Sequence, residues 1–381
     1  MKNILLNIVM VIFSMAIALA TVEFGLGLAG VGSLYKSGIS RISHPILKFQ
    51  LPPEIFSEID SSGFRNITDK GKFDVVILGD SHSYGYGVTA RSSFPVQFSR
   101  QTGLTSYNYG MGGYGPAQYA NLIDDALRKS KKFVVVALFM GNDMFDACNI
   151  ANELLYWREY FEALGIATET CGGRYSPMDS GSQTGDASLS RRLKAFIKQT
   201  RTGSLLNSHV WLPFKGWLKL IGIWPSNPAS LTVDDNTVST IFGVWPNHTA
   251  TAAAGLEITK HLLAQITQSA KQKDIVPILL LLPSKQNIYL DYLLASGYEL
   301  PPNFTESVKQ EKGFTLDLLK FASNSGFVAV SAFNHLMALR KLGHALYPVD
   351  DDSHPDALGY EAYAQTLADA INKYCQRNPG C

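Results

Sequence analysis

Five short apolar runs alternate with longer stretches of helical character, and this alternation constrains the fold of the 381-residue chain more than any other feature. The runs are rich in Val, Ile and Leu without polar alternation, which is typical of strands buried on both faces of a sheet. The expected strands are residues 73–78, 104–109, 133–140, 275–282 and 327–330. The expected helices are residues 116–130, 252–273, 313–324 and 355–374. This order predicts an α/β fold with a mainly parallel central sheet.

A stretch of roughly 110 residues, about 144–254, separates the third and fourth expected strands and is far longer than an ordinary crossover. It is expected to be an inserted subdomain. All five tryptophans lie in it, at positions 157, 211, 217, 224 and 245. These rings suit a substrate lid, a sugar-stacking platform or a membrane-surface contact, and equally a small core of the insertion's own.

The N-terminus has the pattern of an exported protein. After Lys2 no charged residue occurs until Glu23, and residues 4–20 are almost wholly apolar. Residues 1–33 are therefore expected to be a cleaved signal peptide or a retained membrane anchor. Residues 34–71 are interpreted as a linker that approaches a main domain of residues 72–375.

The four cysteines fit export to an oxidising compartment. Cys148 and Cys171 bracket one segment, and Cys375 and Cys381 lie close together near the C-terminus. Two local disulfides are the simplest of the three pairings that four cysteines allow. The chain carries 33 basic and 32 acidic residues, so it has no positive excess of the kind that indicates nucleic-acid binding.

Polar and glycine-rich segments follow the expected strands, at the sheet edge where parallel α/β proteins bind ligands. The first strand is followed by Gly79-Asp80-Ser81, the second by a glycine-rich block at residues 110–115, and the third by Gly141-Asn142-Asp143. A fourth block, residues 350–355 (DDDSHP), precedes the last helix. A serine on a tight turn, a histidine base, a carboxylate to orient it, and amide donors are the components of an acyl-transfer site.

These four ordered blocks resemble those of the SGNH or GDSL hydrolases. The resemblance implies a flavodoxin-like three-layer α/β/α fold, with Ser81 as nucleophile, His354 as general base and Asp351 as the carboxylate that orients it. It further implies that Ser81, Gly113 and Asn142 form the oxyanion hole. The assignments of Asp351 among three aspartates and of Gly113 among several glycines rest on the family spacing.

Other interpretations of these blocks were weighed. The block at residues 110–115 satisfies GxGxxG, but it follows the second strand and no acidic residue lies at the usual interval. Ser81, Asn142 and His354 could each be an ordinary cap or turn residue. The remaining histidines form no pair with metal-ligand spacing, and neither a metal nor a cofactor is expected.

The sequence therefore predicts an extracytoplasmic serine esterase that removes small acyl groups, such as acetyl, from a carbohydrate or lipid. An O-acyltransferase with the same site, and a non-catalytic carbohydrate-binding component of the cell envelope, are the alternatives. The expected location is the periplasm or another extracytoplasmic space, with the N-terminal segment as a candidate inner-membrane anchor.

Overall fold

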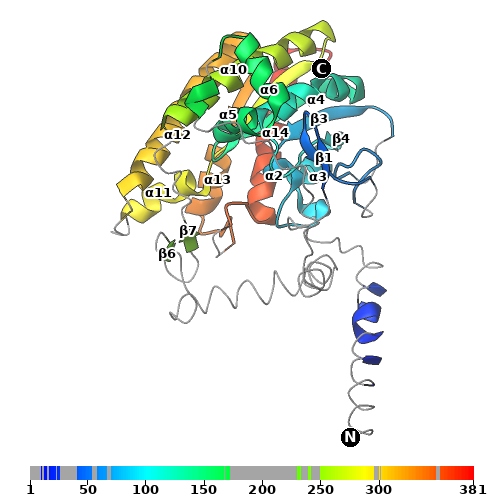
Figure 1. Ribbon diagram of the computed structural model, residues 1–381. Coiled ribbons are helices and arrows are strands. Elements are labelled where there is room, and N and C mark those ends of the chain that lie inside the picture. The colour runs from blue at the N-terminus through cyan, green and yellow to red at the C-terminus, as the bar shows by residue number, and fades with distance from the viewer. Residues whose placement is uncertain are drawn as a thin grey trace, which may run out of the picture.

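A computed structural model places most of the chain (Figure 1). The residues it describes are 41–53, 58–66, 70–166, 168–171, 230–232, 239–241, 249–295, 300, 302–348 and 352–381, with scattered helical positions between 10 and 25. Most of the N-terminal segment and most of the insertion, including Trp211, Trp217, Trp224 and Trp245, lie outside them. None of the helices in the described part of the chain is both long and apolar enough to cross a membrane.

The centre of the molecule is a five-stranded sheet in the order β4-β3-β5-β8-β9, and every neighbouring pair in it is parallel. The strands are β3 Phe73–Gly79, β4 Ser106–Asn108, β5 Ser130–Phe139, β8 Val276–Leu282 and β9 Val328–Ser331. All five expected strands are therefore present, and the predicted parallel α/β fold is confirmed. Because β3 and β5 are adjacent, the loops after them meet at one edge of the sheet.

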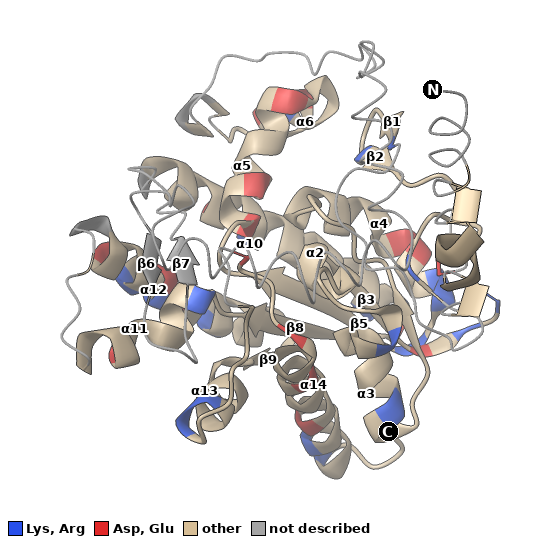
Figure 2. Ribbon diagram, turned by 90° about the horizontal axis from the view of Figure 1, so that it is seen from below, with Lys and Arg blue, Asp and Glu red and all other residues tan. Residues whose placement is uncertain are grey.

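Two layers of helices cover the sheet (Figure 1). One apolar core joins alternate strand residues such as Val76 and Val134 to helices α4, α10 and the C-terminal half of α12. The other joins residues such as Val75 and Val135 to α3, α11, α13 and α14. The bounds are α3 Phe94–Thr102, α4 Pro116–Lys129, α10 Thr249–Gln272, α11 Lys285–Ala295, α12 Pro302–Ser325, α13 Phe333–Lys341 and α14 Ala357–Arg377. Charged residues mark the outer helices, α13 and α14 among them (Figure 2).

The four expected helices correspond to α4, α10, α12 and α14. Helix α12 begins at Pro302, well before the expected start at residue 313. Proline is well accommodated in the first turn of a helix, and this earlier part of α12 buries Phe304 and Val308. The predicted start was wrong, and Gly313 lies within the helix.

The segment expected to be a linker, residues 34–71, packs into the domain where the structure describes it. Strands β1 Ile42–His44 and β2 Lys48–Gln50 form an antiparallel hairpin. Phe49 and Leu51 are buried in the same core as β3, and so is Phe64. The linker interpretation is corrected here, because these apolar side chains are scattered among polar and proline residues and show no period that would have marked an element.

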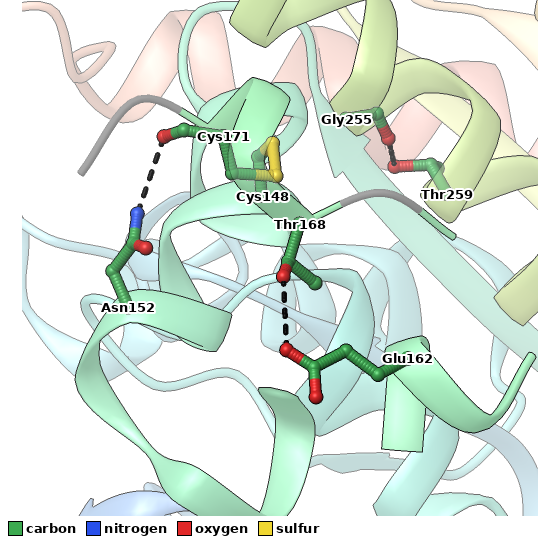
Figure 3. Close-up of a disulfide and its surroundings, with 7 residues drawn as sticks. All are labelled: Cys148, Asn152, Glu162, Thr168, Cys171, Gly255 and Thr259. Carbon is green, nitrogen blue, oxygen red and sulfur yellow. Dashed lines mark hydrogen bonds between the residues drawn. A yellow bond between two sulfur atoms is a disulfide. The ribbon is translucent and has the colours of Figure 1, made fainter. Parts of the chain in front are cut away.

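Two disulfides are present, with the predicted pairing. Cys148–Cys171 joins α5 Asp143–Glu153 to a short 3-10 helix at Thr168–Cys171, and Cys375–Cys381 closes the end of α14. Figure 3 shows the first of them beside α10, where Asn152 Nδ2 donates to the Cys171 carbonyl at 3.2 Å. The pairs are consistent with an oxidising compartment.

Trp157 belongs to a small core around the first disulfide. It lies on α6 Leu155–Ala163, is buried with Cys148 and Phe161, and donates its Nε1–H to the Ile46 carbonyl at 2.8 Å. This tryptophan thus packs in a core that the start of the expected insertion shares with α4 and α10. The other four tryptophans fall outside the described residues.

Candidate active site

Ser81 begins the four-residue helix α2 Ser81–Tyr84, directly after β3 and Asp80. Asp80 caps this helix, because its Oδ1 accepts the backbone N–H of His82 at 2.8 Å. A strand that ends in such a tight turn places the following side chain at the carboxyl edge of the sheet, where Ser81 was expected.

The turn that carries Ser81 is closely packed by backbone. A Cβ atom added at Gly79 would collide with the side chain of Ser83, and one added at Gly110 would lie 2.5 Å from the Tyr84 nitrogen. Only glycine permits this approach of the β4 loop to α2. The glycines of the GxGxxG pattern thus include one that packs against the nucleophile turn.

Arg65 holds the other end of α2. Its guanidinium is buried and donates to the carbonyls of Gly85 at 2.9 Å and Val88 at 3.1 Å. Glu58 accepts from the same group at 2.9 Å. Because the arginine comes from the segment before β3, that segment contributes directly to the position of α2.

His354 lies between Ser81 and a carboxylate. Its Nε2 is 2.7 Å from Ser81 Oγ, and its Nδ1 is 2.5 Å from Asp352 Oδ1. The residues are 273 and 2 positions away in the sequence, respectively, so the fold brings the serine and histidine together as predicted. This is the hydrogen-bond order of a serine–histidine–carboxylate triad.

The carboxylate that contacts His354 is Asp352, whereas the family spacing predicted Asp351. Asp352 Oδ1 also accepts the backbone N–H of His354 at 3.0 Å, so the contact forms within a local turn. Aspartate readily bonds to the backbone two residues further on, and this explains the shorter spacing. Asp351 itself lies outside the described residues.

Two rings flank the His354 imidazole. The His82 ring centroid is 4.7 Å away and the Tyr86 centroid is 4.4 Å away. His82 is fully buried and stacks on Phe139 with centroids 3.7 Å apart. Burial lowers the pKa of His82 well below its usual value, and the nearby His354 lowers it further. His82 is therefore a neutral wall of the site at neutral pH.

Gly112 lies beside Ser81 in the loop that follows β4. A Cβ added at Gly112 would be 3.5 Å from Ser81 Cβ, whereas one added at Gly113 would meet the Phe49 ring at 3.3 Å. Gly113 is exposed and has a φ of 86°. The structure thus places Gly112 beside Ser81, and it places Gly113, the predicted residue, beside Phe49 of β2.

Asn142 follows β5 and caps α5 without using its side chain, since the side chain makes no capping hydrogen bond. Its Oδ1 is buried and has no hydrogen-bond partner in the described part of the chain. An amide that the fold leaves uncommitted at this edge is suited to a role in binding. The structure agrees with the predicted place of Asn142, one strand away from Ser81.

Asp143 fixes the turn that carries Asn142. Its Oδ2 accepts the Phe139 backbone N–H at 2.9 Å, and the Tyr119 hydroxyl is 3.2 Å from both carboxyl oxygens. Burial, together with the charge of Asp80, raises the pKa of Asp143 well above its usual value. The third residue of the Gly141-Asn142-Asp143 block is therefore a structural one.

Asp80 is also fully buried. Burial raises the pKa of Asp80 to about 6, although hydrogen bonds from His82 and Ser81 and the charge of His354 act in the opposite direction. Two buried carboxyl groups with raised pKa values, Asp80 and Asp143, thus lie at this edge of the sheet. Among the residues described, no cluster of three His, Cys, Asp or Glu side chains could hold a metal ion.

Sequence reasoning missed Asp352, Gly112 and Arg65. A signal for Asp352 was present, since an aspartate two residues before a histidine can bond to that histidine's backbone. Gly112 and Arg65 carried no such signal, because only the folded loop shows which glycine meets Ser81 and which arginine meets α2.

Comparison with known proteins gives two solved structures of interest. No family model and no curated protein matches the chain. A protein of the lipolytic G-D-S-L family from Desulfitobacterium hafniense DCB-2 aligns with 78% of this chain and 98% of its own, at 12% identity and a TM-score of 0.36. A protein described as a GDSL-like lipase from Parabacteroides merdae ATCC 43184 aligns over 80% and 98%, at 13% identity and a TM-score of 0.35. Both bear the name of the family that the four sequence blocks resemble. Because these TM-scores are low, the fold is assigned from the order of the strands in the sheet. The candidate site is identified from the contacts among its own residues.

Proposed function

We propose that the protein is an extracytoplasmic serine esterase of the SGNH type, which removes small acyl groups from a carbohydrate or lipid through an acyl-enzyme. The observation that carries this proposal is the pair of contacts on His354: Nε2 to Ser81 Oγ at 2.7 Å and Nδ1 to Asp352 Oδ1 at 2.5 Å. Both lie within the reach that proton transfer between a nucleophile and its base requires.

The reaction follows from this arrangement. Ser81 Oγ attacks the ester carbonyl carbon while its proton passes to His354 Nε2, and the carbonyl oxygen becomes an oxyanion. Asp352 holds the imidazole and stabilises its protonated form. The tetrahedral intermediate collapses when the alcohol leaves with the proton from His354. Water then attacks the acyl-serine in the same way, with His354 again as base, and releases the acid.

Three amide groups are proposed to stabilise the oxyanion: the backbone N–H groups of Ser81 and Gly112, and the side chain of Asn142. The 3.5 Å separation between Ser81 Cβ and a Cβ added at Gly112 supports the choice of this glycine over Gly113. The Asn142 side chain makes no capping hydrogen bond, and this supports its Nδ2 amide as the third donor. Such donors are effective because they are fixed before charge develops.

A cavity adjacent to Asn142 supports an apolar acyl group on the substrate. Its wall includes Gly141 and Met144, on either side of Asn142 and Asp143, and Phe145, Phe304 and Val308 make much of the rest apolar. The two disulfides support a location outside the cytosol.

The test is active-site labelling. The protein is treated with a fluorophosphonate, the adduct is located by mass spectrometry, and p-nitrophenyl acetate turnover is compared between the parent and Ser81→Ala. An adduct on Ser81 with turnover that disappears in Ser81→Ala is expected. Turnover that persists in Ser81→Ala, or a folded parent that neither labels nor turns over the ester, would contradict the proposal.

A further inference from the structure

Lys285 is a buried lysine at the start of α11, immediately after β8. Its exposed fraction is 4%, although lysine is almost never buried unless its charge has partners. The Nζ atom donates to the carbonyl oxygens of Pro348 at 3.1 Å and Asp352 at 3.2 Å. It also lies 5.8 Å from the centre of the Tyr347 ring. The ammonium group is therefore committed to the segment that leads into His354.

One of these two carbonyls belongs to the residue whose carboxylate contacts His354. Lys285 thus donates a hydrogen bond to the backbone of Asp352, while the Asp352 carboxylate accepts hydrogen bonds from the backbone N–H and from Nδ1 of His354. A charged donor makes a stronger hydrogen bond than a neutral one, and an ammonium group can serve several acceptors at once.

The base of Lys285 is itself fixed. Its neighbour Ser284 donates from both its backbone N–H, at 3.0 Å, and its hydroxyl, at 2.5 Å, to the carboxyl group of Glu311 on α12. Asn287 Nδ2 donates to the same carboxyl group at 2.9 Å. Because Glu311 is buried, the turn that carries Lys285 is anchored to the body of the domain. Hydrogen bonds, together with the covalent links from Ser284 to Lys285 and within Asp352, therefore connect α12 to Ser81.

We propose that Lys285 is a positioning residue of this site, which holds Asp352 so that its carboxylate keeps His354 aligned on Ser81. The inference rests on the proposed esterase function and adds a residue to it. Lys285 does not touch the reacting atoms, and its effect passes through Asp352. An error of about 1 Å in the position of a catalytic group can reduce a rate by about 100-fold.

A double-mutant cycle tests this route. The variants are Lys285→Met, Asp352→Asn and the double variant, and the measurements are p-nitrophenyl acetate kinetics and the rate of fluorophosphonate labelling. Lys285→Met is expected to lower kcat by about 10- to 100-fold with little change in KM. In the Asp352→Asn background the same substitution should change kcat by no more than about threefold, because the two residues act as one unit.

The matched control is Lys271→Met. Lys271 likewise donates to a backbone carbonyl, that of Ser325 at 3.1 Å, but at the opposite edge of the sheet, before β9. This variant should keep the parent's activity. A kcat for Lys285→Met equal to the parent's, or a loss that is as large in the Asp352→Asn background as in the parent, would overturn the proposal.

A second readout does not depend on activity. Amide hydrogen exchange at His354 reports the bond from its N–H to Asp352 Oδ1, and it should become faster in Lys285→Met while thermal unfolding remains cooperative. Unchanged exchange would overturn the positioning role. If the parent and Ser81→Ala prove equally active, the esterase proposal fails, and the exchange experiment still decides whether Lys285 holds this segment.

Discussion

A single oxygen of Asp352 accepts two hydrogen bonds from His354, one from the backbone N–H at 3.0 Å and one from Nδ1 at 2.5 Å. The backbone bond fixes the carboxylate relative to the chain, and the side-chain bond then fixes the ring. With Nδ1 engaged, the lone pair of Nε2 faces Ser81 Oγ at 2.7 Å. The orientation of the base is thus determined within three consecutive residues.

We expect Asp352→Asn to reduce kcat by roughly 10²- to 10⁴-fold, because an amide donor at this position favours the wrong imidazole tautomer. Asp351→Asn is the matched control, and its effect should be much smaller. The measurement is steady-state hydrolysis of p-nitrophenyl acetate. A larger loss in Asp351→Asn than in Asp352→Asn would return the triad role to Asp351.

The two adjacent glycines of the β4 loop should respond in opposite ways to alanine. Gly112→Ala places a methyl group at an ordinary van der Waals distance of 3.5 Å from Ser81 Cβ, without a left-handed backbone, so the free energy of unfolding should not change. Because the proposed oxyanion N–H belongs to the same residue, kcat should fall, by about 10-fold at most. Gly113 has a φ of 86°, so Gly113→Ala should lower the free energy of unfolding by about 1–2 kcal/mol and leave kcat near the parent's. Kinetics and denaturant unfolding of both variants test this pair, and the reverse pattern would favour Gly113 as the oxyanion residue.

Asn142→Ala should reduce kcat by about 100- to 1000-fold, the usual effect of removing one oxyanion donor. KM should change little, since the lost interaction is made mainly in the transition state. Asn378→Ala is the control, because the Asn378 side chain lies at the far end of α14, where its Nδ2 donates to the Tyr374 carbonyl at 2.8 Å. An Asn142→Ala enzyme with the parent's kcat would exclude the proposed role.

His82 should make the protein less stable as the pH falls below about 6.5. Burial holds the pKa of His82 well below its usual value in the folded state, so the unfolded chain binds this proton more readily. Stability is therefore present above the unfolded pKa and is lost as the pH falls through it. His82→Phe keeps the stacking on Phe139 and removes this titration. The quantity to compare is the free energy of unfolding of His82→Phe minus that of the parent. Between pH 8 and pH 5 this difference should shift in favour of His82→Phe by at most about 2 kcal/mol.

The check is urea unfolding of both proteins at the two pH values. Asp80 titrates in the opposite sense, because burial raises its pKa to about 6 and stability falls as the pH rises toward that value. Asp80 is present in both proteins, so its contribution largely cancels in the difference. A difference that does not change with pH would contradict the buried, neutral state assigned to His82.

Removal of the first disulfide should cost more stability than removal of the second. Cys148 and Cys171 are 23 residues apart, whereas Cys375 and Cys381 are 6 apart. In the chain-entropy model the longer loop stabilises by about 3 kcal/mol and the shorter by about 2 kcal/mol. Paired Cys→Ala variants, compared by denaturant unfolding, measure this difference. An equal or greater loss for the C-terminal pair would show that loop entropy does not govern these bonds.

Much of the fold could be predicted because buried parallel strands leave a plain record of continuous apolar residues. The run at residues 133–140 and the run at 275–282 are of this kind, and both correspond to neighbouring strands in the sheet. The hairpin at residues 42–50 could not be predicted in this way. It buries few apolar residues, among them Leu47 and Phe49. Its hydrogen bonds with Tyr114 and Trp157 join parts of the chain that are distant in the sequence.

The candidate site, too, could be predicted from the sequence only in part. Ser81, His354 and Asn142 could be located because each follows or precedes an element that the sequence marks clearly. The choice of Asp352 over Asp351 depends on a local turn that the aspartate–histidine spacing allows but does not impose. The choice of Gly112 over Gly113 depends on the folded loop, for which the sequence carries no signal. Lys285 was missed because a lysine is ordinarily exposed, and its burial depends on carbonyls more than sixty positions away.

The turn that carries Ser81 is tightly packed, since a Cβ added at Gly79 would meet the Ser83 side chain and one added at Gly110 would meet Ser83 and the Tyr84 nitrogen. Larger side chains do not fit at these two glycines, so substitutions there can hardly change the substrate specificity. Divergence toward a different substrate would have to occur in the loops after β5 and β8, whose side chains line the neighbouring cavity. In this fold the backbone around Ser81 constrains the reacting groups, whereas substrate selectivity can change through side chains in the loop after the neighbouring strand β5.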